Sequence, residues 1–219
     1  MATIEQLFAE AFRLSVIRRL EGLLGVSGYP LVAGVDEAGR GCLAGPVVAA
    51  AVIPDPGRVV PGVDDSKRLS AEQRESLNQA IRDSVLGVAV AAVAADTIDR
   101  VNILEATRRA MCSALAQLDP PPDCAVVDAV KLPAAPCPCL PLVRAESLCY
   151  AVACASIVAK VARDHLMREL DGCYPQYGFA QHKGYGAPEH LQALHAYGPS
   201  PIHRLTFRSV LPRAPEGVN

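Results

Sequence analysis

The stretch that decides the fold is Leu31-Val32-Ala33-Gly34-Val35-Asp36-Glu37-Ala38-Gly39-Arg40-Gly41, residues 31–41. Its apolar first half predicts a buried strand, and two acids and a glycine-rich turn follow directly. Adjacent residues of a regular strand point to opposite faces, so Asp36 and Glu37 can share one site only if the strand breaks at Gly39 and Gly41. A solvated strand end followed by a turn is the simpler interpretation. A dinucleotide fingerprint fits poorly, because its third glycine is missing.

The rest of the chain alternates apolar runs with helical patterns. The runs predict strands at 46–53, 85–93, 125–127 and 140–143,. Helices are expected at 3–24, 70–83 with Ser70 as N-cap, 101–118, 147–171 with many small residues, and 187–197,. Three strands close together, followed by strands separated by helices, predict an α/β fold with a mixed sheet covered by helices.

Composition excludes several classes of protein. The chain has 219 residues, 51% of them apolar, with 21 Lys and Arg against 23 Asp and Glu, a net charge of −2. These values exclude wholesale disorder and a protein that coats nucleic acid by bulk charge. No unbroken apolar segment resembles a secretory signal or a membrane span, so we expect a cytoplasmic protein with eight reduced cysteines and no membrane contact.

Two further acids follow predicted strands. Asp128 comes directly after the run at 125–127, and Glu146 follows the run at 140–143. Each alone is weak evidence, because Asp commonly starts turns and Glu favours the first turn of a helix. Together with Asp36 and Glu37 they predict a carboxylate cluster if the strands are adjacent. Such a cluster shifts its pKa values or binds hard cations, and a pair of Mg²⁺ or Mn²⁺ ions suits phosphoryl displacement.

A series of sequence blocks resembles the ribonuclease HII family, also called type 2 ribonuclease H. The opening block is LVAGVDEAGRG, and a late block is HKGYG at 182–186. The other blocks follow in family order, at 45–52, 65–70, 102–107, 127–128, 153–164, 174–181 and 203–207. The resemblance implies a ribonuclease H-like fold, with a five-stranded mixed sheet, flanking helices and a helical C-terminal part. It also implies cleavage of the RNA strand of RNA–DNA hybrids and cleavage 5′ of single ribonucleotides in duplex DNA, leaving 5′-phosphate and 3′-hydroxyl ends.

The resemblance also implies which residues bind metal. Asp36, Glu37 and Asp128 match three metal-binding carboxylates of the family, and Glu146 stands where the family usually has Asp. Ala129 likewise replaces a usual glycine. Two divalent cations, Mn²⁺ or Mg²⁺, are therefore expected during catalysis, and the longer Glu146 puts their spacing in question.

Substrate contacts are expected from three further segments. The backbone of Gly39, Arg40 and Gly41 can approach a ribose 2′-hydroxyl, and Tyr185 matches the family's junction-sensing tyrosine,. Lys67 and Lys183 are candidates for phosphate contacts. Lys160 is as well placed to pair with Asp164 on one helix as to touch substrate.

The expected organisation is an N-terminal helical extension at 1–28, a catalytic domain at 29–210 and a tail at 211–219, in a monomer. One alternative is ribonuclease HIII, whose added N-terminal domain exceeds thirty residues. A second is a non-catalytic binder of hybrids, although such a protein would be expected to lose the charge that Glu146 keeps. A third, a small-molecule phosphatase, would have little use for Tyr185.

Overall fold

The computed structural model describes residues 3–211, which are built around one mixed sheet. Its strand order is β3-β2-β1-β4-β5, with β1 parallel to β4, β4 parallel to β5, and β2 antiparallel to both β1 and β3. The strands are β1 (Val32–Ala38), β2 (Val47–Pro54), β3 (Val85–Val93), β4 (Cys124–Asp128) and β5 (Cys139–Leu142). The α/β class and five-stranded mixed sheet expected from the sequence are confirmed.

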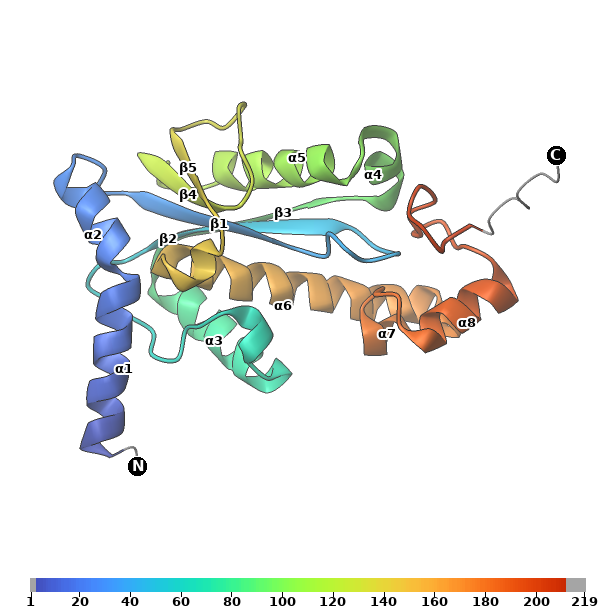
Figure 1. The fold of residues 1–219 in the computed structure, drawn as a ribbon, viewed down its shortest axis with the longest axis horizontal. Helices are drawn as coiled ribbons and strands as arrows, with labels where there is room; N and C mark the ends of the chain where they lie inside the picture. Colours follow the sequence, from blue (N-terminus) through green and yellow to red (C-terminus); the bar gives the residue numbers. More distant parts are fainter. Residues whose placement is uncertain (1–2, 212–219) are drawn as a thin grey trace, which may run out of the picture.

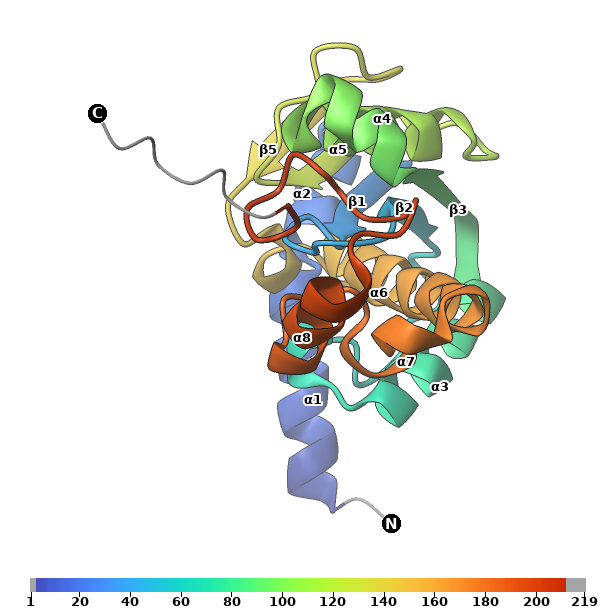
Figure 2. The ribbon, with the colours of Figure 1, turned by 90° about the vertical axis from the view of Figure 1, so that its right-hand side faces the viewer.

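Helices cover both faces of this sheet (Figures 1 and 2). The α-helices are α1 (Ile4–Ile17), α2 (Arg19–Val26), α3 (Ala71–Ser84), α4 (Ala95–Val101), α5 (Ile103–Ala116), α6 (Tyr150–Cys173), α7 (Phe179–His182) and α8 (Pro188–Tyr197). Short 3₁₀ turns lie at Ser66–Arg68, Ala145–Ser147 and Pro175–Tyr177. The last two α-helices form the expected helical C-terminal part.

Two apolar layers enclose the sheet, and its three central strands, β2, β1 and β4, are buried on both faces. Helix α5 packs on one face, where Val35 and Ala51 meet Met111. On the other face α6 and α3 pack, with Ile81 and Ile157 in the same cluster. Strands buried on both faces read as nearly continuous apolar runs, which is why the sequence located them.

The small residues of α6 let it lie directly against the central strand. A side chain at Gly34 on β1 would come within 2.0 Å of the Ala151 backbone carbon. Only glycine permits this approach. The contact fixes α6 relative to the carboxyl end of β1, where the acids lie.

Most predicted helices are confirmed, with three differences. The helix expected at 3–24 is interrupted at Arg18, which separates α1 from α2. The helix expected at 101–118 begins at Ile103 and is preceded by α4, because Asn102 adopts a φ of 70° and its side chain caps α5. The helix expected from 147 begins at Tyr150, after the 3₁₀ turn. Ser70 caps α3 as expected, in a capping box with Gln73.

Three further expectations concern membrane spans, the cysteines and the domain boundaries. No helix among the described residues is long and apolar enough to cross a membrane. All eight cysteines are free thiols. The expected tail at 211–219 lies outside the described residues except for Leu211, and the boundaries at 28 and 210 and the monomeric state stay predictions.

Candidate active site

Three of the four predicted carboxylates surround one cavity. Asp36 and Glu37 lie near the end of β1, and Asp128 is the last residue of the neighbouring parallel strand β4. The cavity has a volume of about 330 Å³. Its lining consists of Asp36, Glu37, Ala38, Gly39, Arg40, Gly41, Ser66, Lys67, Asp128, Ser156, Lys160 and Tyr185. Ligand sites at the carboxyl ends of adjacent parallel strands are a general feature of α/β sheets.

Asp36 and Glu37 both reach this cavity although they lie on a regular part of the strand. Strand β1 ends at Ala38, directly before Gly39 as the sequence suggested, but it stays paired with β2 through both acids, so no break separates them. The two acids share the cavity because of the length of β4, which pairs with β1 only as far as Val35 and ends at Asp128. Beyond that point the β4 side of β1 is open, and side chains from both faces of β1 can border one cavity.

Burial and mutual repulsion shape the electrostatics of the two β1 acids. Asp36 is 8% exposed, and burial together with the neighbouring charges of Glu37 and Asp128 holds its pKa well above the usual range. The Ser156 hydroxyl partly offsets this by hydrogen bonding to the carboxylate. Burial also raises the pKa of Glu37, while an ion pair with Arg40 at 3.2 Å opposes the rise. The site therefore concentrates carboxylates whose charge Arg40 neutralises only in part,.

Glu146 stands beside this cavity but does not line it. Its neighbour Ala145 donates a backbone hydrogen bond of 3.0 Å to Oδ1 of Asp128. One Glu146 oxygen, Oε2, is buried without a hydrogen-bond partner, and the same is true of Glu37 Oε2. The structure thus places the residue before Glu146 against Asp128 and leaves one oxygen of the Glu146 carboxylate without a partner.

Two buried arginines hold the loop that follows β1. The Arg163 side chain donates to the carbonyls of Pro46, Lys183 and Ala44 at 2.9–3.1 Å. Arg204 donates twice to the Gly45 carbonyl and once to that of Arg40, at 2.9–3.0 Å. Both arginines are fully buried. They fix the loop through its carbonyls instead of through carboxylates.

The loop and Arg163 are fitted to each other. Gly39 has a φ of 93°, and a side chain there would come within 1.9 Å of Arg163 Nε. A glycine is therefore required both by the backbone conformation and by the buried guanidinium. This arrangement presents the Gly39–Arg40–Gly41 backbone at the cavity wall.

Tyr185 forms another part of the wall, with 45% of the residue exposed. Lys160 Nζ and the Arg163 guanidinium lie 5.8 and 6.0 Å from the centre of its ring. Lys160 also pairs with Asp164 at 2.7 Å, so the helix pair suggested by the sequence exists. The exposed ring is available for stacking, and cations hold it in place.

The two candidate phosphate-binding lysines differ in position. Lys67 lines the carboxylate cavity. Lys183 does not; it lines the adjoining pocket between α3 and α6, and its ammonium donates to the Ala180 carbonyl. Tyr185 and Lys160 border both spaces, so the two form one continuous surface.

Comparison with known proteins decides the family. The ribonuclease HII family model matches residues 33–210, more than half of the chain. The chain belongs to the ribonuclease HII family. It is 52% identical over 190 residues to the ribonuclease HII of Geobacter metallireducens, an alignment that covers 87% of this chain and 89% of that one. It is 51% identical over 180 residues to that of Ruminiclostridium cellulolyticum, covering 82% and 71%.

A solved structure supports the same assignment. The ribonuclease H2 of Pyrococcus horikoshii superposes with a TM-score of 0.71 at 29% identity, and the match covers 82% of this chain and 94% of that one. The chain is thus a metal-dependent endonuclease with ribonuclease HII activity, which cleaves RNA in RNA–DNA hybrids and at embedded ribonucleotides.

The carboxylates fit the metal use of a ribonuclease HII. Their donor atoms are all carboxylate oxygens, the ligands preferred by Mg²⁺ and Mn²⁺. Two of these oxygens, on Glu37 and Glu146, are buried without partners. Among residues 3–211 no three His, Cys, Asp or Glu side chains already converge on one point. Carboxylates that no cation neutralises repel one another and stay apart, whereas a bound divalent cation draws them together.

Sequence reasoning gave no role to several residues that build this ribonuclease HII site. Arg163, Arg204, Ser66 and Ser156 all lie within the matched blocks, but only the structure shows what they do. The hydroxyls of Ser66 and Ser156 are 2.8 Å apart and hydrogen-bonded. This bond links the 3₁₀ turn before α3 to Ser156, whose hydroxyl also bonds to Asp36. The sign of Arg163 and Arg204 in the sequence was that each stands within one of the matched blocks, at 153–164 and 203–207.

Proposed function

We propose that the cavity bounded by Asp36, Glu37 and Asp128 is the catalytic centre of the ribonuclease HII activity. We further propose that these residues and Glu146 bind two divalent cations, Mn²⁺ or Mg²⁺. The observation that carries this proposal is the meeting of three carboxylates at the ends of two adjacent parallel strands. When bound, such ions activate water and neutralise charge on the scissile phosphate.

The carboxylates divide into two pairs by position. Asp36 and Asp128 come from neighbouring strands and are assigned to one cation, and Glu37 and Glu146 to the other. Arg40 is ion-paired with Glu37, so it holds one Glu37 oxygen while the other stays free for a cation. Glu146 has one methylene more than Asp, which lets its carboxylate approach from outside the cavity lining.

Selection of a ribonucleotide is assigned to two parts of the cavity wall, the Gly39–Arg40–Gly41 loop and Tyr185. The Gly39–Arg40–Gly41 peptide groups donate to and accept from the 2′-hydroxyl, a group that distinguishes RNA from DNA. Tyr185 stacks beside the deoxyribose that follows, and Lys67 and Lys183 contact phosphates. This arrangement directs the cut to the 5′ side of a single ribonucleotide and leaves 5′-phosphate and 3′-hydroxyl ends.

Manganese titration tests the metal assignment separately from activity. Free Mn²⁺ is followed by electron paramagnetic resonance while it is added to the wild-type chain, to Asp128→Asn and to Glu146→Asp. Wild type and Glu146→Asp are expected to bind Mn²⁺, and Asp128→Asn is expected to bind at least tenfold more weakly. Equal binding by Asp128→Asn would remove that residue from the metal site.

A further inference from the structure

A buried histidine holds the backbone at Tyr185. Nδ1 of His190 lies 2.7 Å from the Tyr185 carbonyl, and the His190 side chain is fully buried. Among residues 3–211, His190 is the one side chain that hydrogen-bonds to the Tyr185 main chain. The other bonds of the Tyr185 carbonyl and N–H go to the backbone of Ala187 and His182. The position of the Tyr185 backbone therefore depends on where the His190 ring lies.

The two residues before Tyr185 are held by different groups. The Lys183 carbonyl accepts a hydrogen bond from Arg163, and the Gly184 carbonyl accepts one from the N–H of Leu43 at 2.8 Å. These bonds fix the place where the chain enters Tyr185, relative to α6 and to the loop after β1. The bond from His190 acts on the other side, where the chain leaves Tyr185 toward α8.

A chain of hydrogen bonds runs from Ser200 through two histidines to Tyr185. The Ser200 N–H lies 2.9 Å from Nδ1 of His203, and the Nε2 atoms of His203 and His190 are 3.0 Å apart. A backbone N–H can only donate and a carbonyl can only accept, so the two ends fix the direction of every bond. His203 therefore carries its proton on Nε2, and His190 carries its proton on Nδ1. Both rings are neutral, and each donates once and accepts from its neighbour.

Burial favours this neutral form. It lowers the pKa of His190, and together with the neighbouring His190 it lowers the pKa of His203 to about 4. The third nearby histidine, His182, accepts from the Gly184 N–H at Nδ1 and donates from Nε2 to the Tyr177 carbonyl at 2.8 Å. All three rings thus have one defined tautomer.

Aromatic packing fixes the orientation of the His190 ring. The His182 ring stacks on it with centroids 4.5 Å apart, and the Phe179 ring meets it edge-on at 5.4 Å. A ring held between two others cannot turn its Nδ1–H away from the Tyr185 carbonyl without disturbing both contacts. The bond to Tyr185 is therefore set by the packing of α7 and α8, which lie side by side (Figures 1 and 2).

We propose that His190 is a positioning residue for Tyr185, and that the chain from Ser200 through His203 sets the place of His190. His190 lines neither the carboxylate cavity nor the adjoining pocket, so it acts on substrate only through Tyr185. The inference rests on the proposed role of Tyr185 beside the deoxyribose that follows a single ribonucleotide. A long hybrid has a ribose in that place, so a displaced Tyr185 affects cleavage at a single ribonucleotide more.

Two variants separate the two bonds of His190. In His190→Asn the amide nitrogen replaces Nδ1 and can still donate to Tyr185, whereas in His190→Gln the amide oxygen replaces Nε2 and can still accept from His203. The measured quantity is the ratio of kcat/KM on duplex DNA with one ribonucleotide to kcat/KM on a long hybrid. We expect His190→Gln to lower this ratio about fivefold, as for one lost neutral hydrogen bond, and His190→Asn to keep it within about twofold.

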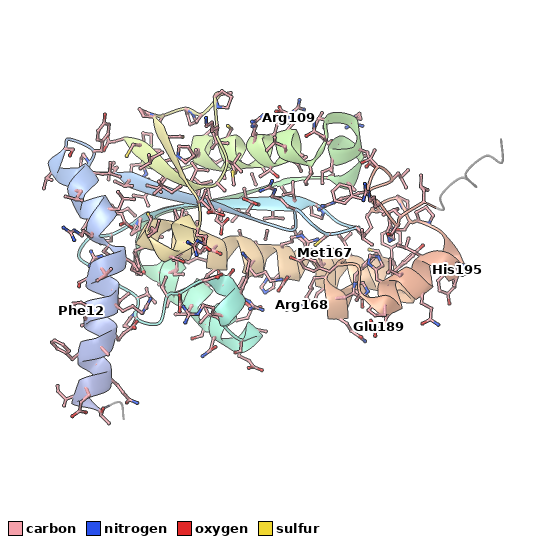
Figure 3. All side chains as sticks on the ribbon, viewed as in Figure 1. Phe12, Arg109, Met167, Arg168, Glu189 and His195 are labelled. Atoms are coloured by element: carbon pink, nitrogen blue, oxygen red, sulfur yellow. The ribbon has the colours of Figure 1, made fainter. Side chains whose placement is uncertain are left out.

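Two further variants are the controls. His195→Gln changes an exposed histidine of the same helix, labelled in Figure 3, and should keep the wild-type ratio. Tyr185→Ala tests the role on which the inference rests. A wild-type ratio in Tyr185→Ala overturns the assigned role of Tyr185 itself. A ratio that is lowered in Tyr185→Ala but not in His190→Gln overturns only the role of His190, and so does an equal loss in His190→Asn and His190→Gln.

Nuclear magnetic resonance of the wild type checks the hydrogen-bond chain without any substitution. In protein labelled with ¹⁵N-histidine, long-range ¹H–¹⁵N correlations show which ring nitrogen carries the proton. At neutral pH we expect His190 to carry it on Nδ1, and His182 and His203 on Nε2. A His190 proton on Nε2 overturns the proposal, because that tautomer cannot donate to the Tyr185 carbonyl.

Discussion

The buried guanidinium of Arg163 donates a hydrogen bond of 2.9 Å to the backbone carbonyl of Lys183, two residues before Tyr185. The same side chain holds the carbonyls of Ala44 and Pro46 on the loop after β1. One residue of α6 therefore ties the two walls assigned to ribonucleotide selection to each other.

Arg163→Lys tests this connection. Lysine keeps the charge but lacks the planar set of donors, so it cannot satisfy all three carbonyls. We expect kcat/KM to fall about tenfold on duplex DNA with one ribonucleotide, or about 1.4 kcal/mol, and less on a long hybrid. Arg168→Lys is the control, since Arg168, labelled in Figure 3, is exposed on the same helix. Its guanidinium pairs with Glu75. If the ratio of kcat/KM on the single-ribonucleotide duplex to kcat/KM on the long hybrid stays unchanged, Arg163 has no role in selecting the ribonucleotide.

Asp36→Asn is expected to stabilise the metal-free protein. Burial and the charges of Glu37 and Asp128 disfavour the ionised Asp36, as the direction of its pKa shows. The neutral amide removes that repulsion, and a gain of about 1 kcal/mol raises Tm by about 2–4 °C in a chain of this size. Thermal unfolding in a chelator at pH 7.5 measures it. The same variant should lose the stabilisation that Mn²⁺ gives the wild type, and a lower Tm in chelator would contradict the account.

The histidine pair behind Tyr185 predicts a pH dependence of stability. His203 and His190 are buried with their Nε2 atoms 3.0 Å apart, and His190 Nδ1 lies 2.7 Å from the Tyr185 carbonyl. Burial and the neighbouring His190 lower the pKa of His203 from 6.5 to about 4. Between these values the unfolded chain binds the proton and the folded chain does not, so stability falls as pH drops.

This dependence is measurable by chemical unfolding at several pH values. From pH 7 to pH 5 the contribution of His203 to the free energy of unfolding should fall by about 2 kcal/mol. His203→Asn, whose amide oxygen can replace the acceptor Nδ1, should lose most of this dependence. The control His195→Asn, an exposed residue of α8, should keep it. If the free energy of unfolding depends equally on pH in both variants, His203 is not the cause.

Ala129→Gly is expected to stabilise the protein. Ala129 follows Asp128 with a φ of 49°, a left-handed conformation that costs a residue with a side chain about 1–2 kcal/mol,. Glycine removes this strain but has more conformational freedom in the unfolded chain. The free energy of unfolding should therefore rise by about 0.5–1 kcal/mol. Urea unfolding measures the change. A loss of stability would show that the Ala129 side chain makes compensating contacts.

Much of this molecule could be predicted from its residues. The five apolar runs predicted the strands; β1, β2 and β4 are apolar along their whole length because both of their faces are buried. The acids at 36, 37 and 128 followed from their places at strand ends and from the matched blocks. A carboxylate cluster was predicted, but not how Asp36 and Glu37 come to share one cavity, since this depends on β4 ending before β1 does. The roles of Arg163 and Arg204 were also hidden, because their partners are backbone carbonyls, which leave no mark in a sequence. Periodicity also showed that α1 is an amphipathic helix, but not that it buries Leu14 and Ile17 while Phe8 and Phe12 stay exposed.

Cleavage of duplex DNA that contains one ribonucleotide tests the assigned site most directly. The wild type and Asp128→Asn are incubated with the labelled duplex and Mg²⁺ or Mn²⁺, and the products are sized and their ends determined by mass spectrometry. We expect the wild type to cut 5′ of the ribonucleotide, leaving a 3′-hydroxyl and a 5′-phosphate. Asp128→Asn should lose more than about 100-fold in rate while it still binds the duplex. Cleavage by Asp128→Asn at the wild-type rate would contradict the assignment of the catalytic centre to this cavity.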